Sequence, residues 1–283
     1  MSGFRRLLMA DTKPYHPNET VYDVDMSFES TLSYSVGVMN PYADLLIDWG
    51  DGTVTTEPKN GTNRAVAHQY TSSEQYTIRI YSVDRKGAYT IYHNHNENAA
   101  LCVVRVRQIG DYLPKAVDLF YLCRNLAKID SGVKIRSLID KRCSTIFGMC
   151  GNNTSGLYVN DDFTVPDDVY TCYGIFYYAK VLNLPKAFRV PSACASMRSF
   201  ANNATNMAGD ITNIFPEAWA SKTATINIGG AFSNCRKITG TAPAHLLWNA
   251  PNITWSDTTN CFLNCTGLTN YNEIPASWGG GGA

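Results

Sequence analysis

The chain has 283 residues, of which 45% are apolar and 17% are charged, and its formal net charge is zero. This composition is enough to bury a sizeable core in one or two domains. The balanced charge argues against a nucleic-acid-binding protein, because neutralising phosphates needs a basic surplus or a clear basic stripe. No apolar run approaches the roughly 20 residues of a membrane-spanning helix, so we expect no membrane insertion.

Residues 1–19 are expected to form an N-terminal arm. Two arginines precede a short apolar run, but the apolar region of a secretory signal needs about 7 to 15 residues, so nothing here directs export. The arm is either a frayed terminus or a segment that docks onto a partner subunit. The residues of such a docking arm are Phe4, Arg5, Arg6, Leu7 and Leu8.

Residues 20–108 predict a β domain. Short segments alternate β-branched or aromatic residues with polar ones and are broken by Gly, Asn, Asp and Pro, a pattern typical of a sandwich. The expected strands cover residues 21–28, 32–38, 45–49, 76–83 and 100–106. Asp51-Gly52 indicates a hairpin, because Gly tolerates positive φ and Asp bonds to the turn backbone. Trp49 and Tyr70 are expected to supply core bulk.

Three motifs stand in this region, namely Trp49-Gly-Asp-Gly52, His68-Gln-Tyr70 and Tyr76-Thr-Ile78. Together they resemble the polycystic-kidney-disease (PKD) domain family. Residues 73–75 depart from the family pattern, which usually has a Gly before the strand. Domains of this family are spacers or binding modules, so the resemblance implies presentation of a surface and not catalysis.

The second half, residues 109–278, repeats one phrase six times. A Phe is followed three positions later by Cys, Ala or Asn and, in most copies, six positions later by Leu or Ile. The phrases begin 24 to 32 residues apart, at Phe120, Phe147, Phe176, Phe200, Phe232 and Phe262. A unit of this length cannot bury its apolar side alone, so neighbouring units must stack into a solenoid.

Most units carry a second phrase, in which an aliphatic or aromatic residue follows a proline by three positions. Its prolines are Pro166, Pro185, Pro216, Pro243 and Pro275. Because Pro suits the first position of a helix, each unit is expected to contain a short helix. The Cys of the first phrase alternates with Ala179 and Asn203, so it is expected to be a small buried filler.

The phrases F-x-x-C-x-x-L and P-x-x-[FW] resemble the BspA-type leucine-rich repeats of bacterial surface proteins and of phages of gut bacteria; residues 261–269 are the nearest copy. Residues 151–155 interrupt the pattern. The predicted fold is therefore mainly β, a PKD-like β-sandwich followed by a leucine-rich-type β/α solenoid of about six repeats. Residues 279–283 are expected to be a flexible Gly-rich end.

The nine cysteines are odd in number and offer no C-x-x-C motif, so we interpret them as reduced thiols of a protein that folds in a reducing cytoplasm. Residues 93–97, with two histidines and a glutamate, could bind a metal but are more simply a polar loop. Asp48 and Asp51 could bind calcium, although a turn role is simpler. The acidic pairs 161–162 and 167–168 lack the partner that glycoside cleavage requires. We therefore predict no catalytic, cofactor-binding or metal-ligating residue.

Tyr and Asn suit contact surfaces, because they supply rigid area and adaptable hydrogen bonds. The predicted partner-binding residues are Tyr177, Tyr178, Asn202, Asn234 and Asn264. The predicted function is a non-enzymatic bacteriophage virion protein, a head or tail fibre or a capsid decoration, assembled in the host cytoplasm. Its partners would be other virion subunits and a host surface glycan or protein, and a homo-oligomer is left open. The alternatives are a bacterial cell-surface adhesin and, third, a glycan-processing enzyme.

Overall fold

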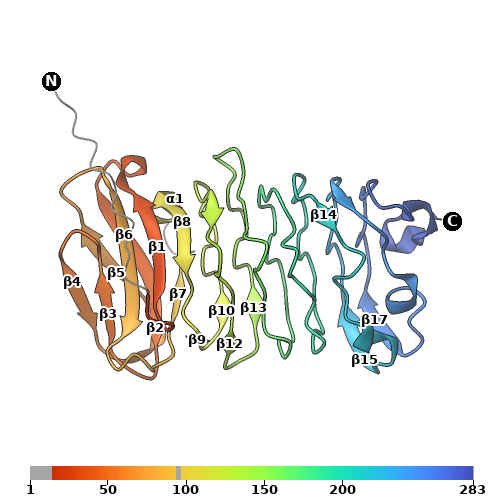
Figure 1. Cartoon of the computed structure of the whole chain (residues 1–283), viewed down its shortest axis with the longest axis horizontal. Coiled ribbons are helices and arrows are strands. Elements are labelled where there is room, and N and C mark those ends of the chain that lie inside the picture. The colour runs from red at the N-terminus through yellow and green to blue at the C-terminus, as the bar shows by residue number, and fades with distance from the viewer. Residues whose placement is uncertain (1–14, 94–96, 283) are drawn as a thin grey trace.

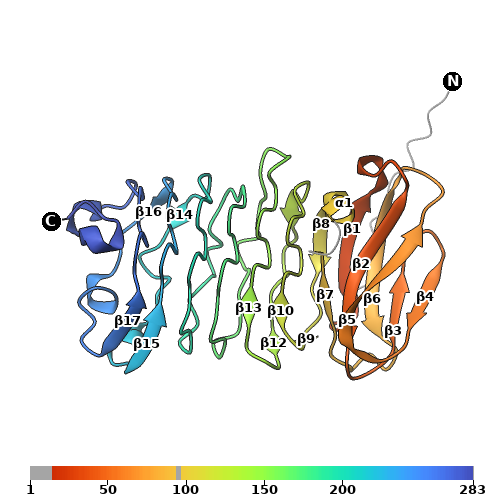
Figure 2. The same ribbon diagram turned by 180° about the vertical axis from the view of Figure 1, so that it is seen from behind.

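The computed structural model describes residues 15–93 and 97–282. Two β-sheets form the N-terminal end of an elongated body, and the rest of the chain winds into coils stacked toward the C-terminal end (Figures 1 and 2). In the described part of the chain, the single α-helix is the short α1 (Glu97–Cys102). The predictions of a mainly β protein and of stacked repeats are therefore confirmed.

The two N-terminal sheets contain the five expected strands and four further strands. One sheet has six strands in the order β11-β8-β1-β6-β3-β4, and the other has three in the order β5-β2-β7. Their bounds are β1 Thr20–Asp25, β2 Ser33–Asn40, β3 Leu45–Asp48, β4 Val54–Glu57, β5 Asn60–Gln69, β6 Gln75–Ser82, β7 Thr90–Tyr92, β8 Val103–Gln108 and β11 Lys128–Ile129. The first strand ends earlier than predicted because the Asp25 side chain caps the 3-10 helix η1 (Met26–Phe28). The last begins later because α1 takes up the first residues of the predicted segment.

The sheets share a core of aromatic side chains. Tyr34 of β2 packs against Tyr22 of β1 and against Trp49, with ring centroids 6.5 and 6.4 Å apart. Trp49 and Tyr70 are fully buried, as predicted. Their burial removes large apolar surfaces from water, the dominant favourable contribution to folding.

The predicted hairpin joins β3 and β4. The Trp49 N–H donates to the carbonyl of Thr53 at 3.1 Å, and the Thr53 N–H donates to the Asp51 carboxylate at 3.0 Å. Gly50 and Gly52 have φ of 82° and 96°, a region that Gly occupies without steric cost. The Gly-Asp-Gly sequence thus determines this turn locally.

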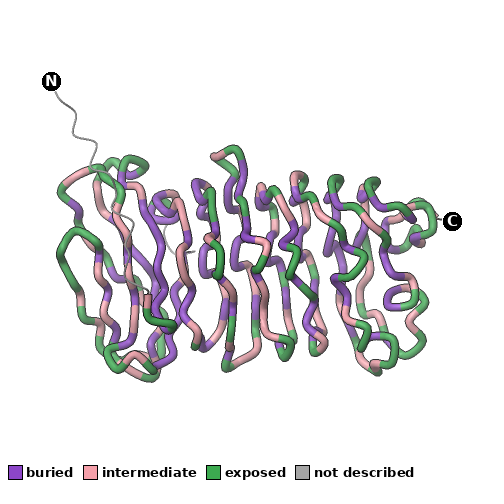
Figure 3. The backbone as a smooth tube through the Cα atoms, viewed as in Figure 1, coloured by how far each residue is buried: buried purple, intermediate pink, exposed green. Residues whose placement is uncertain are grey.

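Each following coil contributes short parallel β segments. The segments in one row are β10 (Ala116–Val117), β13 (Cys143–Ser144), β15 (Ala224–Asn227) and β17 (Ile253–Asp257). The others are β9 (Tyr112–Leu113), β12 (Ser137–Leu138), β14 (Gly209–Asp210) and β16 (Ile238–Thr239). Isolated parallel bridges connect the remaining coils. Figure 3 shows buried residues in every coil, so the core runs the length of the body.

A hydrogen-bond ladder joins one seven-residue segment of each coil to the next. The segments are residues 116–122, 143–149, 172–178, 197–203, 228–234 and 258–264. Alternate residues of each segment donate their N–H to carbonyls of the following coil, so that four bonds of 2.7 to 3.1 Å join every neighbouring pair. We call these the ladder segments. Because each coil satisfies its neighbour's backbone, no coil is complete alone.

The ladder corrects the predicted register of the fourth repeat. The Phe147 N–H donates to the residue before Phe176, whereas the Phe176 N–H donates to Phe200 itself. Ala201, and not Phe200, therefore occupies the position of the other phenylalanines. The fourth phrase is residues 201–207, and Ala204, not Asn203, takes the place of the cysteine.

The physical reason for this shift is ring packing. Phe200 enters the core from the preceding position, with its centroid 5.5 Å from Phe176, 5.1 Å from Phe188 and 5.6 Å from Phe232. Elsewhere the phenylalanines of neighbouring coils stack nearly parallel, as Phe232 does on Phe262 at 5.8 Å and 3°. The small side chain of Ala201 leaves room in the core for the ring of the preceding residue, Phe200.

The predicted helices are only single turns. In all five proline phrases the N–H of the fourth residue donates to the proline carbonyl, at 2.9 to 3.3 Å. Three of these turns are 3-10 helices, namely η2 (Glu217–Ala220), η3 (Ala244–Leu246) and η5 (Ala276–Trp278), and η4 (Tyr271–Glu273) precedes the last. Proline stands at the N-cap of η2, η3 and η5 and not at the predicted first helical position. No α-helix forms between residues 109 and 282, because each phrase spans a single turn.

Both N-terminal sheets continue into the coils. β8 pairs in parallel with β11, and Arg105 of β8 holds Asp130 beyond β11 through two bonds of 2.8 and 2.7 Å. After β7, the His93 N–H donates to the Asp118 carbonyl at 3.2 Å. The His93 ring stacks on Phe120 at 5.5 Å and so extends the phenylalanine stack into the sheets. The predicted boundary between residues 108 and 109 thus lies inside one continuous core.

Two predictions about the chain ends need correction. Residues 15–19 belong to the folded body, since the buried Glu19 carboxylate accepts from Arg79 at 2.7 Å. The predicted docking residues Phe4, Arg5, Arg6, Leu7 and Leu8 lie outside the described residues. Residues 279–282 are not a flexible end, because the N–H of Gly282 donates to Ile274 at 2.9 Å and its three neighbours bond similarly. A Cβ on Gly280 would lie 2.2 Å from the Ile274 carbonyl oxygen, so close packing requires glycine there.

Candidate functional site

Every ladder segment contains two residues in the left-handed backbone conformation, four positions apart. The first members are Asp118, Thr145, Gly174, Ser199, Gly230 and Asn260, with φ of 46° to 63°. The second members are Leu122, Met149, Tyr178, Asn203, Asn234 and Asn264, with φ of 51° to 64°. Only glycine and, less readily, asparagine and aspartate adopt this region easily. We call the surface formed by the second, third, sixth and seventh positions of the ladder segments the ladder face. At the seventh position the side chains are half-buried or exposed from Met149 onward, whereas Leu122 of the first coil is buried.

Tyrosines of the first and third coils lie on the ladder face, whereas the ladder segment of the second coil has none. Tyr178 and Tyr173 are 46% and 40% exposed, and the ring of Tyr178 meets that of Tyr177 at 4.6 Å. Tyr121 lies against the backbone of the second coil, since a Cβ on Gly148 would be 2.9 Å from its ring. Burial, together with the charge of Asp118 and the nearby tyrosines, raises the pKa of Tyr121. These four rings belong to the first and third coils of the ladder face.

Asparagines continue the ladder face over the last three coils. The Asn234 amide donates to Asn203 at 2.8 Å, and the Asn264 amide donates to Asn234 at 2.7 Å. The Asn203 amide in turn donates to Asn202. Each amide has two N–H donors and a two-lone-pair oxygen, so donor and acceptor capacity remains for a ligand. These asparagine side chains are half-buried, so their hydrogen bonds first of all stabilise the stacking of the coils.

The cysteines of the phrase stabilise the ladder from inside. Cys150, Cys235 and Cys265 each donate an S–H to a carbonyl of the preceding coil, at 2.8, 3.0 and 3.0 Å. Burial raises the pKa of Cys265 to about 12, which keeps the thiol protonated as a donor. All nine cysteines are buried and free, as predicted. The phrase cysteine is therefore a hydrogen-bond donor as well as a filler.

Charge is nearly absent from the ladder face. Among the second, third, sixth and seventh positions of the six ladder segments, only Asp118 and Arg198 carry a charged side chain. The hydroxyl of Thr145 donates to Asp118. The surface therefore offers ring faces, amides and hydroxyls, which suit an uncharged, hydroxyl-rich partner.

Neither a protein family, nor a curated protein, nor a solved structure matches this chain. Within residues 15–93 and 97–282, no helix is long and apolar enough to cross a bilayer.

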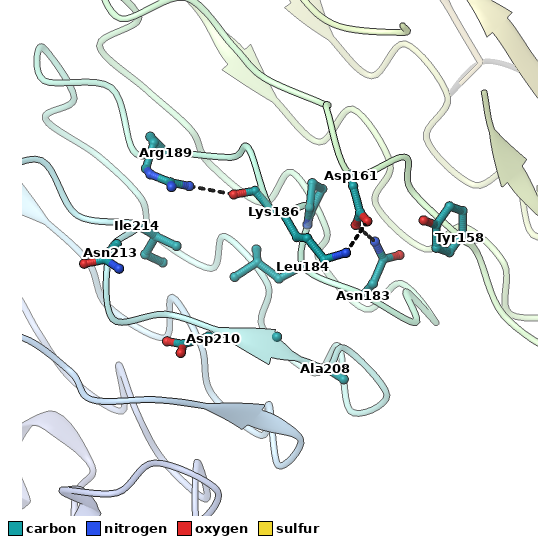
Figure 4. Close-up of a pocket in the computed structure, with 12 residues that line it drawn as sticks. Tyr158, Asp161, Asn183, Leu184, Lys186, Arg189, Ala208, Asp210, Asn213 and Ile214 are labelled. Carbon is teal, nitrogen blue, oxygen red and sulfur yellow. Dashed lines mark hydrogen bonds and ion pairs between the residues drawn. The ribbon is translucent and has the colours of Figure 1, made fainter. Parts of the chain in front are cut away.

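A groove of about 590 Å³ lies on the loops around β14, away from the ladder segments (Figure 4). The Lys186 ammonium is 2.7 Å from Asp161, and Arg189 donates to the Lys186 carbonyl at 2.8 Å. Asp210 accepts the Thr212 N–H at 2.7 Å, and the hydrogen bonds from Thr212 lower the pKa of Asp210. The Lys186–Asp161 pair joins neighbouring coils, whereas Arg189 and Asp210 bond within their own loops. These charged groups therefore have structural partners.

The acidic pairs have structural partners too. Asp161 and Asp168 are each 2.7 Å from a lysine ammonium, and Asp162 accepts a backbone N–H at 2.9 Å. Asp167 accepts the hydroxyl and the N–H of Ser192 at 2.5 and 2.6 Å, and these bonds lower the pKa of Asp167 despite partial burial. A general acid needs a raised carboxyl pKa, and that of Asp167 is lowered. The contacts of the four carboxylates join neighbouring coils.

The proposed metal ligands of the N-terminal sheets are also engaged. Asp51 accepts from Thr53 and from His68 Nε2 at 2.7 Å; burial opposes ionisation, but these bonds outweigh it and lower the pKa of Asp51. His93 Nδ1 is 2.5 Å from the Leu119 carbonyl, and its Nε2 is 2.9 Å from the Tyr34 hydroxyl. No group of three or more His, Cys, Asp or Glu could hold a metal ion within the described ranges, which exclude residues 94–96.

The structure brings the predicted partner-binding residues onto one surface. Tyr177, Tyr178, Asn202, Asn234 and Asn264 all lie on the ladder face, although Asn202 precedes the left-handed position that Asn234 and Asn264 occupy. Their partner-binding role remains a prediction.

Sequence reasoning missed three residues of this surface. Tyr121 follows its phenylalanine at the same offset as Tyr177, so a strict comparison of repeats would have found it. Asn203 was misplaced by the one-residue register error. Tyr173 precedes the phrase, and only the ladder reveals that its position faces outward.

Proposed function

We propose that this protein is a non-enzymatic binding protein, a bacteriophage virion component such as a fibre or capsid decoration, whose ladder face contacts a host or partner molecule. The observation that carries the proposal is the nearly uncharged surface along the coils, with tyrosines on the first and third coils and asparagines on the last three. Equivalent positions of successive coils lie side by side, about 4.8 Å apart as neighbouring strands do. Such a surface suits recognition of an extended partner.

The modular reading of the sequence supports this proposal. We propose that the two-sheet region is a PKD-like β-sandwich, because the Trp49 ring stacks on His68 at 4.9 Å and His68 meets Tyr70 at 4.6 Å, which gives the motif residues a common structural role. We also propose that the coils are BspA-type leucine-rich repeats whose helical half is reduced to one turn. Both resemblances imply presentation of a surface.

The partners and the place of assembly follow from the same proposal. The nine buried thiols support folding in a reducing host cytoplasm, where thiols remain reduced. The N-terminal end would attach to other virion subunits, and the coils would project outward. A nucleic-acid partner would need several cations, whereas the ladder face has one, Arg198.

Proteomics of particles and of cell envelopes tests the proposal. Phage particles and bacterial envelopes are purified separately from a culture that carries the gene, and peptides of this chain are quantified in both. We expect enrichment in particles, together with binding of the labelled full chain to host cells. Enrichment in envelopes would favour the bacterial surface adhesin instead, and absence of cell binding would overturn the binding function.

A further inference from the structure

The ladder face changes character between the third and fourth coils. The ring pair Tyr177–Tyr178 ends the tyrosine half, and the amide pair Asn202–Asn203 begins the other half. The two pairs are adjacent, because the Tyr178 N–H donates to the Asn202 carbonyl at 2.8 Å. Ring faces and amides therefore meet at one place.

This combination selects a ligand chemistry. An exposed ring face attracts polarised C–H groups, because its π-system is electron-rich, and amides donate to and accept from hydroxyls. Tyr178 presents a ring that is 46% exposed, and burial raises the pKa of Tyr177, which favours the neutral form of that ring. A ligand with both apolar C–H faces and many hydroxyls would satisfy both halves.

The scarcity of cations on this surface limits the class of ligand further. The cation nearest the amide pair in sequence is Arg198, which is exposed on the same ladder segment. A polyanion needs several cations to offset its desolvation, and a single arginine is insufficient. A neutral polymer needs none.

We infer that the junction of Tyr177 and Tyr178 with Asn202 and Asn203 binds a neutral polysaccharide, with sugar rings stacked on the tyrosines and hydroxyls bonded to the amides. This inference rests on the proposed binding function and specifies its ligand. A chain of sugar units extends along the coils, because equivalent positions recur from coil to coil. The amides that support the ladder hold the binding groups in place before the ligand arrives.

The test uses the full chain and a double variant, Tyr177→Asn/Tyr178→Asn. These substitutions copy the residues that stand at the same positions of the fourth coil, Asn202 and Asn203, so they preserve the backbone conformation. The matched control is Tyr42→Asn/Tyr112→Asn, which replaces two tyrosines that are 52% and 56% exposed outside the ladder face. Thermal unfolding of all three proteins verifies folding.

Binding is measured by biolayer interferometry against mannan and dextran as neutral probes and polygalacturonate as an anionic probe. We expect binding to at least one neutral polysaccharide, unchanged between about 50 and 500 mM salt. We expect roughly tenfold or greater weakening in the ladder-face variant, as loss of ring stacking implies, and no change in the control. Preferential binding of polygalacturonate, or equal binding by wild type and the ladder-face variant, would overturn the inference.

A cell-binding assay distinguishes the proposed ligand from the proposed binding function. If the labelled chain binds host cells but neither neutral polysaccharide binds or competes, the ligand assignment fails while the binding function stands. If competition by a neutral polysaccharide removes cell binding, and the ladder-face variant does not bind cells, both proposals are supported. Absence of any cell binding counts against the proposed function itself.

Discussion

Replacing Asn234 tests whether the ladder depends on its left-handed asparagines. Asn234 has φ of 64° and joins Asn203 and Asn264 through amide bonds of 2.8 and 2.7 Å. Asn234→Gly removes both bonds and keeps the backbone unstrained, whereas Asn234→Ala removes both and forces a Cβ into the left-handed region. The pair of variants therefore separates the amide bonds from the backbone conformation.

The expected costs follow from these two contributions. Each net hydrogen bond contributes about 0.5 to 1.5 kcal/mol, so Asn234→Gly should lower the free energy of unfolding by about 1 to 3 kcal/mol. The left-handed conformation costs an alanine roughly 1 to 2 kcal/mol more, of which the greater freedom of unfolded glycine offsets about 0.4 to 1 kcal/mol. Asn234→Ala should thus be the less stable variant, by up to about 1.6 kcal/mol.

Guanidinium chloride unfolding followed by tryptophan fluorescence measures both costs. Asn252 supplies the control, because it is exposed and is not among the left-handed residues; there, Gly should be no more stable than Ala. Wild-type stability in both Asn234 variants would refute the ladder's role. A more stable Ala than Gly at position 234 would refute the backbone argument.

Three further outcomes are expected. Phe232→Ala should cost about 3 to 5 kcal/mol by leaving a cavity beside the Phe262 ring, and an unaltered melting curve would contradict its burial. Hydrogen bonds from Ser192 hold the pKa of Asp167 below its usual value. The ionised carboxylate therefore stabilises the fold at pH values above the usual carboxyl pKa, and this stabilisation is lost as pH falls through the lowered pKa. The free energy of unfolding, measured against pH, should fall less on acidification in Asp167→Asn than in the wild type, and identical profiles would count against this role. Gly280→Ala should lower the melting temperature, because its Cβ would lie 2.2 Å from the Ile274 carbonyl oxygen. An unchanged melting temperature would show that residues 279–282 move to accommodate the Cβ and are not tightly packed.

The sequence by itself determined the local elements and the repeat. Gly-Asp-Gly after Trp49 specifies the β3–β4 hairpin, because glycine is needed where φ is positive and aspartate bonds to the turn backbone. Alternating apolar residues located most N-terminal strands, since one face of each strand is buried. The spacing of phenylalanines predicted stacked coils, because a short unit cannot bury its own apolar side. It also led to two tyrosines and three asparagines that share the ladder face.

Only the tertiary structure decided the register of the fourth repeat, the packing of the C-terminal glycines and the connection between the sheets and the first coil. Ala201 takes the phenylalanine position because the Phe200 ring fills the same core space from one residue earlier. Side chains of neighbouring coils fill the core together, so the sequence of a single phrase does not specify its packing. The glycines of residues 279–282 pack because of where Ile274 lies, although their composition alone predicts flexibility. His93 joins the sheets to the first coil through Asp118 and Leu119, a contact between residues about 25 positions apart. Such contacts depend on how distant segments meet, and local sequence preference does not specify them.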